Sequence, residues 1–335
     1  MRRRLEQVLQ DPLFLLWLLI AGQITAWTAA PLVVHTAPPL DVVEGYMWGR
    51  EWVIATYKHP ALPSWVLEAS RLLTGAVGWP AYVVSQLFVS LTFVFVFLLG
   101  REMMDAERAA AGALLLTGVG YFMWPTVEFN HDIAEVTLWT ATAWAFWLAV
   151  ERNGIFRWML AGALAAASFY AKLTAALLAL AMAAWLLWDG RARRSLTTPG
   201  PWVGLAVFVA VVWPLAAWLV AHDFLPLHYA VGRLEGPSGD HILGFSLKTL
   251  LNFGVMLGML AIAGLLGPRR SQPSANASEG GAGRPPVAAR AIRFLLLVIA
   301  GPLALTLVGA LTSGASLKPR WAGATLTLAG VLAVA

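Results

Sequence analysis

The sequence predicts an all-α protein, a polytopic bundle of transmembrane helices, and three observations carry this prediction. Apolar residues make up 59% of the 335 positions, and charged residues only 12%. The mean hydropathy is +0.70. The apolar residues also gather in runs that approach the ~20 residues a helix needs to cross a bilayer. Because ordinary globular domains carry about twice this share of charge, the composition excludes a soluble fold.

Ten apolar runs are candidate spans, and together they predict a single membrane domain over residues 1–335 with about ten crossings. The fifth and sixth runs are short, and Lys172 lies at the break between them. The first run is too long for a signal peptide and lacks a small-residue cleavage site, so we expect it to be retained. The runs cover residues 12–32, 79–99, 109–125, 133–150, 157–170, 173–188, 201–221, 248–267, 294–312 and 321–335.

The distribution of basic residues predicts a cytoplasmic N-terminus. With that orientation one set of short loops holds 15 of the 23 Lys and Arg residues, as the positive-inside rule requires. The net charge of +5 therefore reflects topology, and no basic stripe with interleaved aromatic residues indicates nucleic acid. The 15 residues are Arg2, Arg3, Arg4, Arg101, Arg108, Arg152, Arg157, Arg191, Arg193, Arg194, Arg269, Arg270, Arg284, Arg290 and Arg293.

Two polar segments interrupt the apolar runs. Residues 33–78 form a predicted outer loop with short amphipathic helices and many ionisable groups. Residues 268–293 include SQPSANASEGGAGRPP, a composition typical of a flexible linker, here on the cytoplasmic side. Cysteine is absent, so a thiolate nucleophile or a thiolate metal site is excluded.

The outer loop holds the first candidate catalytic residues, Asp41 and Glu44. Asp41, Glu44 and Trp48 recur at i, i+3 and i+7, which places both carboxylates on one face of a helix beside an indole ring. Two neighbouring carboxylates can divide the roles of general base and of metal or orienting ligand. The alternative is a capping arrangement, with Asp41 at the start of a helix and Glu44 reaching back to its first turn.

Basic residues along the same predicted face form a candidate anion site. Lys58 and His59 precede Pro60, which favours an extended conformation for His59, and a lysine suits a phosphate as a point charge. Lys172 is a lone cation in apolar surroundings, where it meets an anion or else extends toward the interface. Four further residues complete the basic groups on this side, namely Arg233, Lys248, Lys318 and Arg320, although Lys318–Trp321 equally fits an interfacial anchor. Lys58 has the same structural alternative, an ammonium directed toward lipid head groups.

A third cluster opens the fourth run, where Glu128–Asp132 reads EFNHD. His131 and Glu135 have the spacing of two ligands on one helix, which is weak evidence for a metal without a third ligand. We therefore predict no metal site built by the protein.

The order of these motifs resembles the C superfamily of membrane glycosyltransferases. The shared order is an acidic first loop, Tyr-x-His-Pro, an aspartate opening the fourth span and a lysine between two short helices. The resemblance is to bacterial polyprenyl-phosphate-sugar transferases related to protein O-mannosyltransferases and the lipid A aminoarabinose transferase, and it covers residues 12 to about 190. This sequence departs from the family pattern at Val43 and Lys58, where the family commonly has aspartates, and at Ala61, where the family has a second proline.

The resemblance implies a hexosyl- or pentosyltransferase in the bacterial inner membrane, with its active face periplasmic. A sugar moves from a polyprenyl-phosphate carrier to a lipid, glycan or protein acceptor by inverting displacement, and a first-loop carboxylate, Asp41 or Glu44, acts on the acceptor hydroxyl. Lys58, His59, Lys172 and Arg320 bind the donor phosphate. The resemblance leaves open whether a divalent cation, Mg²⁺ or Mn²⁺, binds together with the phosphate. Substrate contacts are assigned to Tyr46, Tyr57, His131 and Asp132.

Two other classes compete with this interpretation, a transporter or lipid flippase and a non-catalytic scaffold. Transporters show internal symmetry and a polar site at the bilayer midplane, whereas no repeat is visible here and the ionisable residues gather at one face. The chain is also shorter than members of the family, and its last apolar run stops about 15 residues in, which predicts a truncated product or an inactive fragment.

Overall fold

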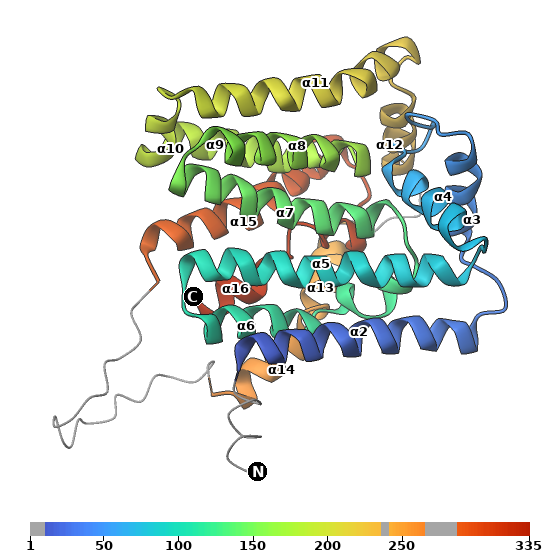
Figure 1. The fold of residues 1–335 in the computed structure, drawn as a ribbon, viewed down its shortest axis with the longest axis horizontal. Coiled ribbons are helices and arrows are strands. Elements are labelled where there is room, and N and C mark those ends of the chain that lie inside the picture. The colour runs from blue at the N-terminus through green and yellow to red at the C-terminus, as the bar shows by residue number, and fades with distance from the viewer. Residues whose placement is uncertain (1–10, 236–240, 265–286) are drawn as a thin grey trace.

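The computed structural model describes residues 11–235, 241–264 and 287–335, and within these the fold is helical throughout, as predicted. The long helices lie side by side along the long axis of the molecule (Figure 1). Helices α3, α4 and α12 gather at one end of this bundle and α10 lies at the other. The polytopic helical architecture expected from the sequence is therefore confirmed.

Nine of the ten predicted runs correspond to helical segments. They are α2 (Pro12–Val34), α5 (Trp79–Met103), α6 (Ala106–Leu115) with the short 3-10 turns η1 (Leu116–Gly118), η2 (Gly120–Phe122) and η3 (Trp124–Val127), α7 (His131–Arg152), α8 (Ile155–Ala171), α9 (Ala175–Trp188), α11 (Pro199–Ala221), α13 (Ile242–Leu251) with α14 (Gly254–Ile262), and α15 (Ala289–Ser313).

Length and composition support fewer crossings than the ten predicted. In the described part of the chain six helical segments are long and apolar enough to span a membrane, or seven if the bent pair of segments over residues 106–127 is one span. Helices α8 and α9 are shorter, as their short apolar runs indicated. These segments make the chain a multi-pass membrane protein.

The tenth predicted span, 321–335, is wrong. Residues 319–322 form a short 3-10 turn, η4 (Pro319–Ala322), and only Ala329–Val334 is helical, as α16. The segment packs against α6, where the backbones meet so closely that a Cβ on Gly330 would lie 2.1 Å from the carbonyl oxygen of Gly112. Its apolar character therefore reflects burial inside the protein.

The structure describes one of the two predicted polar segments in full and the other only at its end. The outer loop 33–78 contains two helices, α3 (Leu40–Arg50) and α4 (Leu62–Thr74). Most of the predicted linker 268–293 lies outside the described residues, but residues 289–293 form the first turns of α15.

Buried polar side chains hold the bent segment 106–127 in place. The Gln86 amide donates to the carbonyl of Thr126 (2.9 Å), and the Gln23 amide donates to that of Phe122 (3.4 Å). Backbone groups that leave a helix inside a membrane protein need such partners, because no water is present to replace them. This segment leads directly to Asn130, so its position determines where α7 begins.

Side-chain caps and glycines fix the remaining elements near the site. The Asn130 side chain caps α7 by accepting from the backbone N–H groups of Asp132 (3.0 Å) and Ile133 (3.3 Å). Helices α8 and α11 approach closely, since a Cβ on Gly162 would lie 2.1 Å from the carbonyl oxygen of Gly204. Small residues at such crossings are typical of membrane helix pairs.

Candidate active-site cavity

A cavity lies where the outer loop meets α7, the α8–α9 break and the turn η4. It encloses about 390 Å³ of empty space, including its opening to the surroundings. Five separate stretches of sequence contribute to its wall, so only the folded chain creates it. The lining residues are Asp41, Glu44, Trp48, Lys58, His59, Asn130, His131, Asp132, Lys172, Arg320 and Trp321.

The first ion cluster joins α3 to the following loop through Lys58. The ammonium of Lys58 lies 2.7 Å from Glu44 Oε2 and 3.1 Å from Asp41 Oδ1. Burial opposes the charge on Lys58, but its hydrogen bond to Glu44 and the charge of Asp41 outweigh that effect, so its pKa lies above the usual value. The lysine therefore stays charged and holds both candidate catalytic carboxylates.

A tight turn presents Lys58 and His59 together. The hydroxyl oxygen of Thr56 accepts from the backbone N–H groups of both residues at 3.2 Å, and the Thr56 N–H donates to the His59 carbonyl at 2.9 Å. A threonine that satisfies backbone groups two and three residues ahead is a common turn device. Pro60 then ends the turn in a bridge with Ala55.

The second ion cluster centres on Lys172, which occupies the break between α8 and α9 as predicted. Its ammonium lies 2.7 Å from Asp132 Oδ1 and 3.0 Å from Glu135 Oε2, and the Thr174 hydroxyl also donates to Glu135. The side chains of Lys172 and Glu135 are only 8% and 4% exposed. Such a buried lysine is tolerated because carboxylates accompany it.

Arg320 reaches this cluster from the other end of the sequence. Its Nε lies 3.4 Å from the second oxygen of Asp132, and its side chain is 48% exposed. The turn that carries it is held by the Tyr121 hydroxyl, which donates to the carbonyl of Pro319. Arg320 is thus the most accessible and least tightly paired of the three cations that line the cavity.

Two imidazole rings, those of His59 and His131, lie close together in the cavity wall. The ring centroids of His59 and His131 lie 4.2 Å apart. Burial, together with the positive charges of its neighbours, lowers the pKa of His59 far below its usual range. His131 Nε2 lies 3.0 Å from the carbonyl oxygen of Pro60, so this nitrogen carries the proton. Because its pKa is so low, His59 is neutral, and it contributes a hydrogen-bonding group instead of the cation that the sequence suggested.

The charges that line the cavity are balanced, three carboxylates (Asp41, Glu44, Asp132) against three cations (Lys58, Lys172, Arg320). An entering phosphate must compete with protein carboxylates for each of these cations.

Among the described residues no three His, Asp or Glu side chains come together in a way that could hold a metal ion. Glu135, the weak metal-ligand candidate, is engaged by Lys172 and Thr174.

The structure brings Lys58, His59 and Lys172 to one cavity, with Arg320, His131 and Asp132 in the same wall, and the binding roles assigned to these residues stay predictions. The capping alternative for Asp41 is not what forms, because α3 begins after Pro39 with no side-chain cap.

Tyr46 requires a correction, and Tyr57 lies beside the cavity. Tyr46 is buried, its hydroxyl lies 3.5 Å from Ser70 Oγ on α4, and it is not among the lining residues, so we reassign it from substrate binding to helix packing. Tyr57 is half exposed and packs edge-on against Trp48, which lines the cavity. Its role in substrate binding stays a prediction.

Sequence reasoning missed two contributors. Asn130 lines the cavity and caps α7. Its position directly before an apolar helix is a recognised N-cap signal, so the capping role could have been predicted. Tyr229 from α12 (Leu225–Glu235) contacts the rings of Tyr57 and His59, with centroids 5.5 and 6.3 Å away. No local signal identifies Tyr229, because only the tertiary fold brings α12 over the outer loop.

The fold and the cavity define a class, the multi-pass helical membrane proteins with a charged cavity at one end of the bundle. A family model described as dolichyl-phosphate-mannose-protein mannosyltransferase matches residues 58–218. A curated relative, undecaprenyl phosphate-alpha-4-amino-4-deoxy-L-arabinose arabinosyl transferase 1 of Pseudomonas fluorescens, is 25% identical over 228 residues, which are 63% of this chain and 41% of the relative.

Solved structures show the same fold. The chain matches ArnT from Cupriavidus metallidurans bound to undecaprenyl phosphate with a TM-score of 0.70 and 15% identity, over 95% of this chain and 59% of that one. The apo form gives a TM-score of 0.59 with 16% identity, over 94% and 59%. The chain thus spans less than two thirds of these proteins.

With the family match, these findings relate the chain to the C-superfamily glycosyltransferases of the protein O-mannosyltransferase and aminoarabinose transferase group, and the resemblance drawn from the sequence is confirmed.

Proposed function

We propose that this protein is a glycosyltransferase that moves a sugar from a polyprenyl-phosphate carrier to a lipid, glycan or protein acceptor. The observation that carries the proposal is the meeting of Lys58, Lys172 and Arg320 with Asp41 and Glu44 around one cavity of a membrane bundle. A leaving phosphate and an acceptor hydroxyl need these two kinds of group, cations and a carboxylate base. The names of the relatives, which include undecaprenyl phosphate, support the same donor class.

We assign the phosphate to the side of the cavity that holds Lys172 and Arg320. Arg320 would meet it first, because its contact with Asp132 is long and its side chain is half exposed. Lys172 is already oriented by Asp132 and Glu135, so it can shift one hydrogen bond to the phosphate without a change of conformation. The developing charge of the leaving group then meets cations already in position, which lowers the barrier without further reorganisation.

We assign the base to the side that holds Asp41 and Glu44. Glu44 has the shorter bond to Lys58, 2.7 Å against 3.1 Å for Asp41. The carboxylate with the longer contact is the one more easily released from Lys58 to face an acceptor hydroxyl, so Asp41 is our preferred base and Glu44 the group that orients Lys58. Neutral His59 can position the acceptor hydroxyl or the sugar by hydrogen bonding.

The proposed location is the bacterial inner membrane, with the cavity on the periplasmic face. The segregation of arginines supports this orientation. Arg101, Arg152, Arg191 and Arg290 belong to the ends of helices remote from the outer loop (Figure 1), where the positive-inside rule places the cytoplasm.

Sugar transfer by the purified protein in lipid nanodiscs tests this proposal, with an undecaprenyl-phosphate-linked aminopentose or hexose as donor and extracted membrane glycolipid as acceptor. We expect Asp41→Asn to lower the transfer rate at least a hundredfold, the range for loss of a general base. Glu51→Gln removes an exposed carboxylate of the same loop and serves as the matched control. Wild-type rates in both Asp41→Asn and Glu44→Gln would exclude the carboxylate mechanism. Lipid translocation without sugar transfer would favour a flippase.

A further inference from the structure

A second cavity lies at the opposite end of the bundle, between α9, α10 (Gly190–Ser195) and the start of α15. It encloses about 360 Å³ of empty space, including its opening, and is lined by Trp185, Trp188, Asp189, Gly190 and Arg293. None of these residues takes part in the proposed sugar transfer. The cavity combines two tryptophan side chains with one cation, Arg293, near the start of the membrane helix α15.

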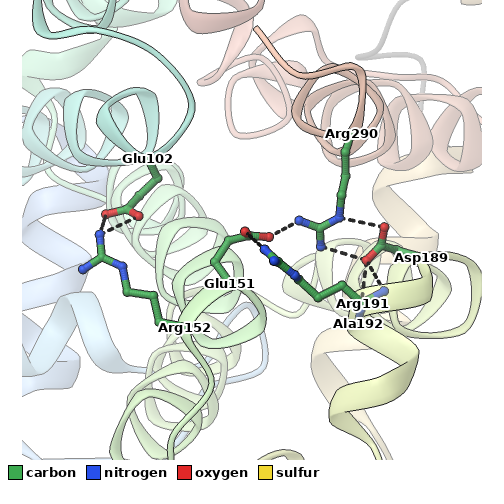
Figure 2. A network of polar contacts seen from close by, with 7 residues as sticks. All are labelled: Glu102, Glu151, Arg152, Asp189, Arg191, Ala192 and Arg290. Carbon is green, nitrogen blue, oxygen red and sulfur yellow. Dashed lines mark hydrogen bonds and ion pairs between the residues drawn. The ribbon is translucent and has the colours of Figure 1, made fainter.

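The carboxylate in this cavity is already neutralised. Figure 2 shows Arg290 between Asp189 and Glu151, with its Nη2 and Nε 2.7 and 2.8 Å from the two oxygens of Asp189. Arg191 also bonds Glu151, and the Arg290 guanidinium lies 4.8 Å from the ring centroid of Trp147. Arg290 thus has a fixed structural role, and Asp189 offers no unpaired negative charge to repel an anion.

Two other arginines, Arg293 in the cavity wall and Arg194 beside the lining residue Gly190, have no such partner. Arg293 lies one helical turn after Arg290, on the same face of α15, and lines the cavity. Arg194 extends back along α10, where its Nη1 lies 4.0 Å from the point that a Cβ on Gly190 would occupy. Both are exposed, and neither bonds a carboxylate anywhere in the described ranges.

The surroundings identify the kind of anion. Trp188 is 62% exposed at the end of α9, and tryptophan at that depth marks the head-group region of a bilayer. Basic pockets between membrane helices on the cytoplasmic side bind anionic lipid head groups, and arginine pairs suit phosphate oxygens. A lipid can place its phosphate between the two guanidinium groups while its chains lie along the exposed indole of Trp188.

We propose that this cavity binds the phosphodiester group of an anionic membrane phospholipid, and that Arg194 and Arg293 are its ligands. The site is independent of the sugar-transfer cavity at the other end of the molecule. Its occupation would join α10 to α15 through the lipid, next to the Arg290–Asp189 contact that already connects these elements.

Native mass spectrometry of the protein from phosphatidylcholine nanodiscs containing phosphatidylglycerol tests the proposal. We expect wild type to retain phosphatidylglycerol in preference to phosphatidylcholine. Arg293→Gln and Arg194→Gln should each reduce this retention about tenfold, as expected for the loss of a charged hydrogen-bond donor to the phosphate. Arg101→Gln removes an exposed arginine from the end of α5 outside the cavity and should change retention less than twofold.

A charge-neutral variant separates the cavity from general electrostatic attraction. Gly190→Leu adds a bulky side chain to the cavity wall, where the nearest atom to its Cβ is Arg194 Nη1 at 4.0 Å, and should reduce retention as much as the arginine variants do. Equal losses in Arg101→Gln, or full retention in Gly190→Leu, would overturn the proposal in favour of diffuse attraction to the surface. Competition by millimolar inorganic phosphate would instead indicate a site for free phosphate. Thermal melting of each variant in detergent confirms that it is folded.

Discussion

Lys172 Nζ lies 2.7 Å from Asp132 Oδ1, and this contact connects the break between α8 and α9 to the first turn of α7. Neither group would be stable alone at this depth, since a buried charge without a partner costs several kcal/mol. Glu135 adds a second carboxylate 3.0 Å from the same ammonium. The pair therefore connects α7 to the α8–α9 break, and under the proposed function Lys172 could give one of its two bonds to a phosphate and keep the other.

Replacement of Lys172 by methionine should destabilise the protein by about 3–5 kcal/mol, because Asp132 and Glu135 then remain buried without their cation. The measurement is the free energy of unfolding in mixed micelles. Arg320→Met is the matched control and should cost at most about 1 kcal/mol, since its contact with Asp132 is long and half exposed. A cost below about 1 kcal/mol for Lys172→Met would show that the contacts of Lys172 with Asp132 and Glu135 do not stabilise the fold.

The contribution of Arg320 should instead appear in ligand binding. Arg320→Gln removes a charged donor worth roughly 1.5–3 kcal/mol, so we expect undecaprenyl phosphate to bind about tenfold more weakly or worse. A neutral polyprenol should bind as it does to wild type. Arg50→Gln, an exposed arginine at the end of α3, controls for the loss of charge near the site. Equal weakening of both ligands by Arg320→Gln would point to a packing defect.

Much of the fold was predictable because apolar runs of the right length leave few alternatives to membrane helices. Nine segments were predicted, and Lys172 was correctly expected at a helix break. The failure at 321–335 has a definite cause. Composition measures apolarity but cannot tell whether the neighbours are lipid or protein, and residues 322–331 are largely buried against the bundle.

The residues that line the site could be predicted from the sequence, but the ion pairs that they form could not. Asp41 and Lys58 were both identified, yet their ion pair depends on how the Thr56 turn folds back over α3. Likewise, Asp132 and Lys172 meet across 40 positions of sequence. Charges in an apolar sequence can be recognised as costly, but which charge compensates which is a property of the tertiary structure.

The cap of α7 should matter because it sets the position of Asp132. Asn130→Ala removes the side-chain acceptor for two backbone N–H groups and should cost about 0.5–2 kcal/mol of stability. Asn130→Ser keeps an acceptor and should recover most of that loss. Unfolding in mixed micelles measures both variants, and an identical loss in serine and alanine would show that the amide acts through other contacts.

Acid should destabilise the protein through His59. Burial depresses the pKa of His59 in the folded state far below the ~6.5 of the unfolded chain. Below pH 6.5 the unfolded state therefore binds a proton that the folded state does not, so this contribution to stability is complete above that pH and is lost as the pH falls. The slope approaches about 1.4 kcal/mol per pH unit. His59→Gln should reduce the fall in unfolding free energy between pH 7.5 and 5.5 by roughly 1 kcal/mol. An unchanged pH profile in His59→Gln would mean that water or a charged partner already reaches this imidazole in the folded protein.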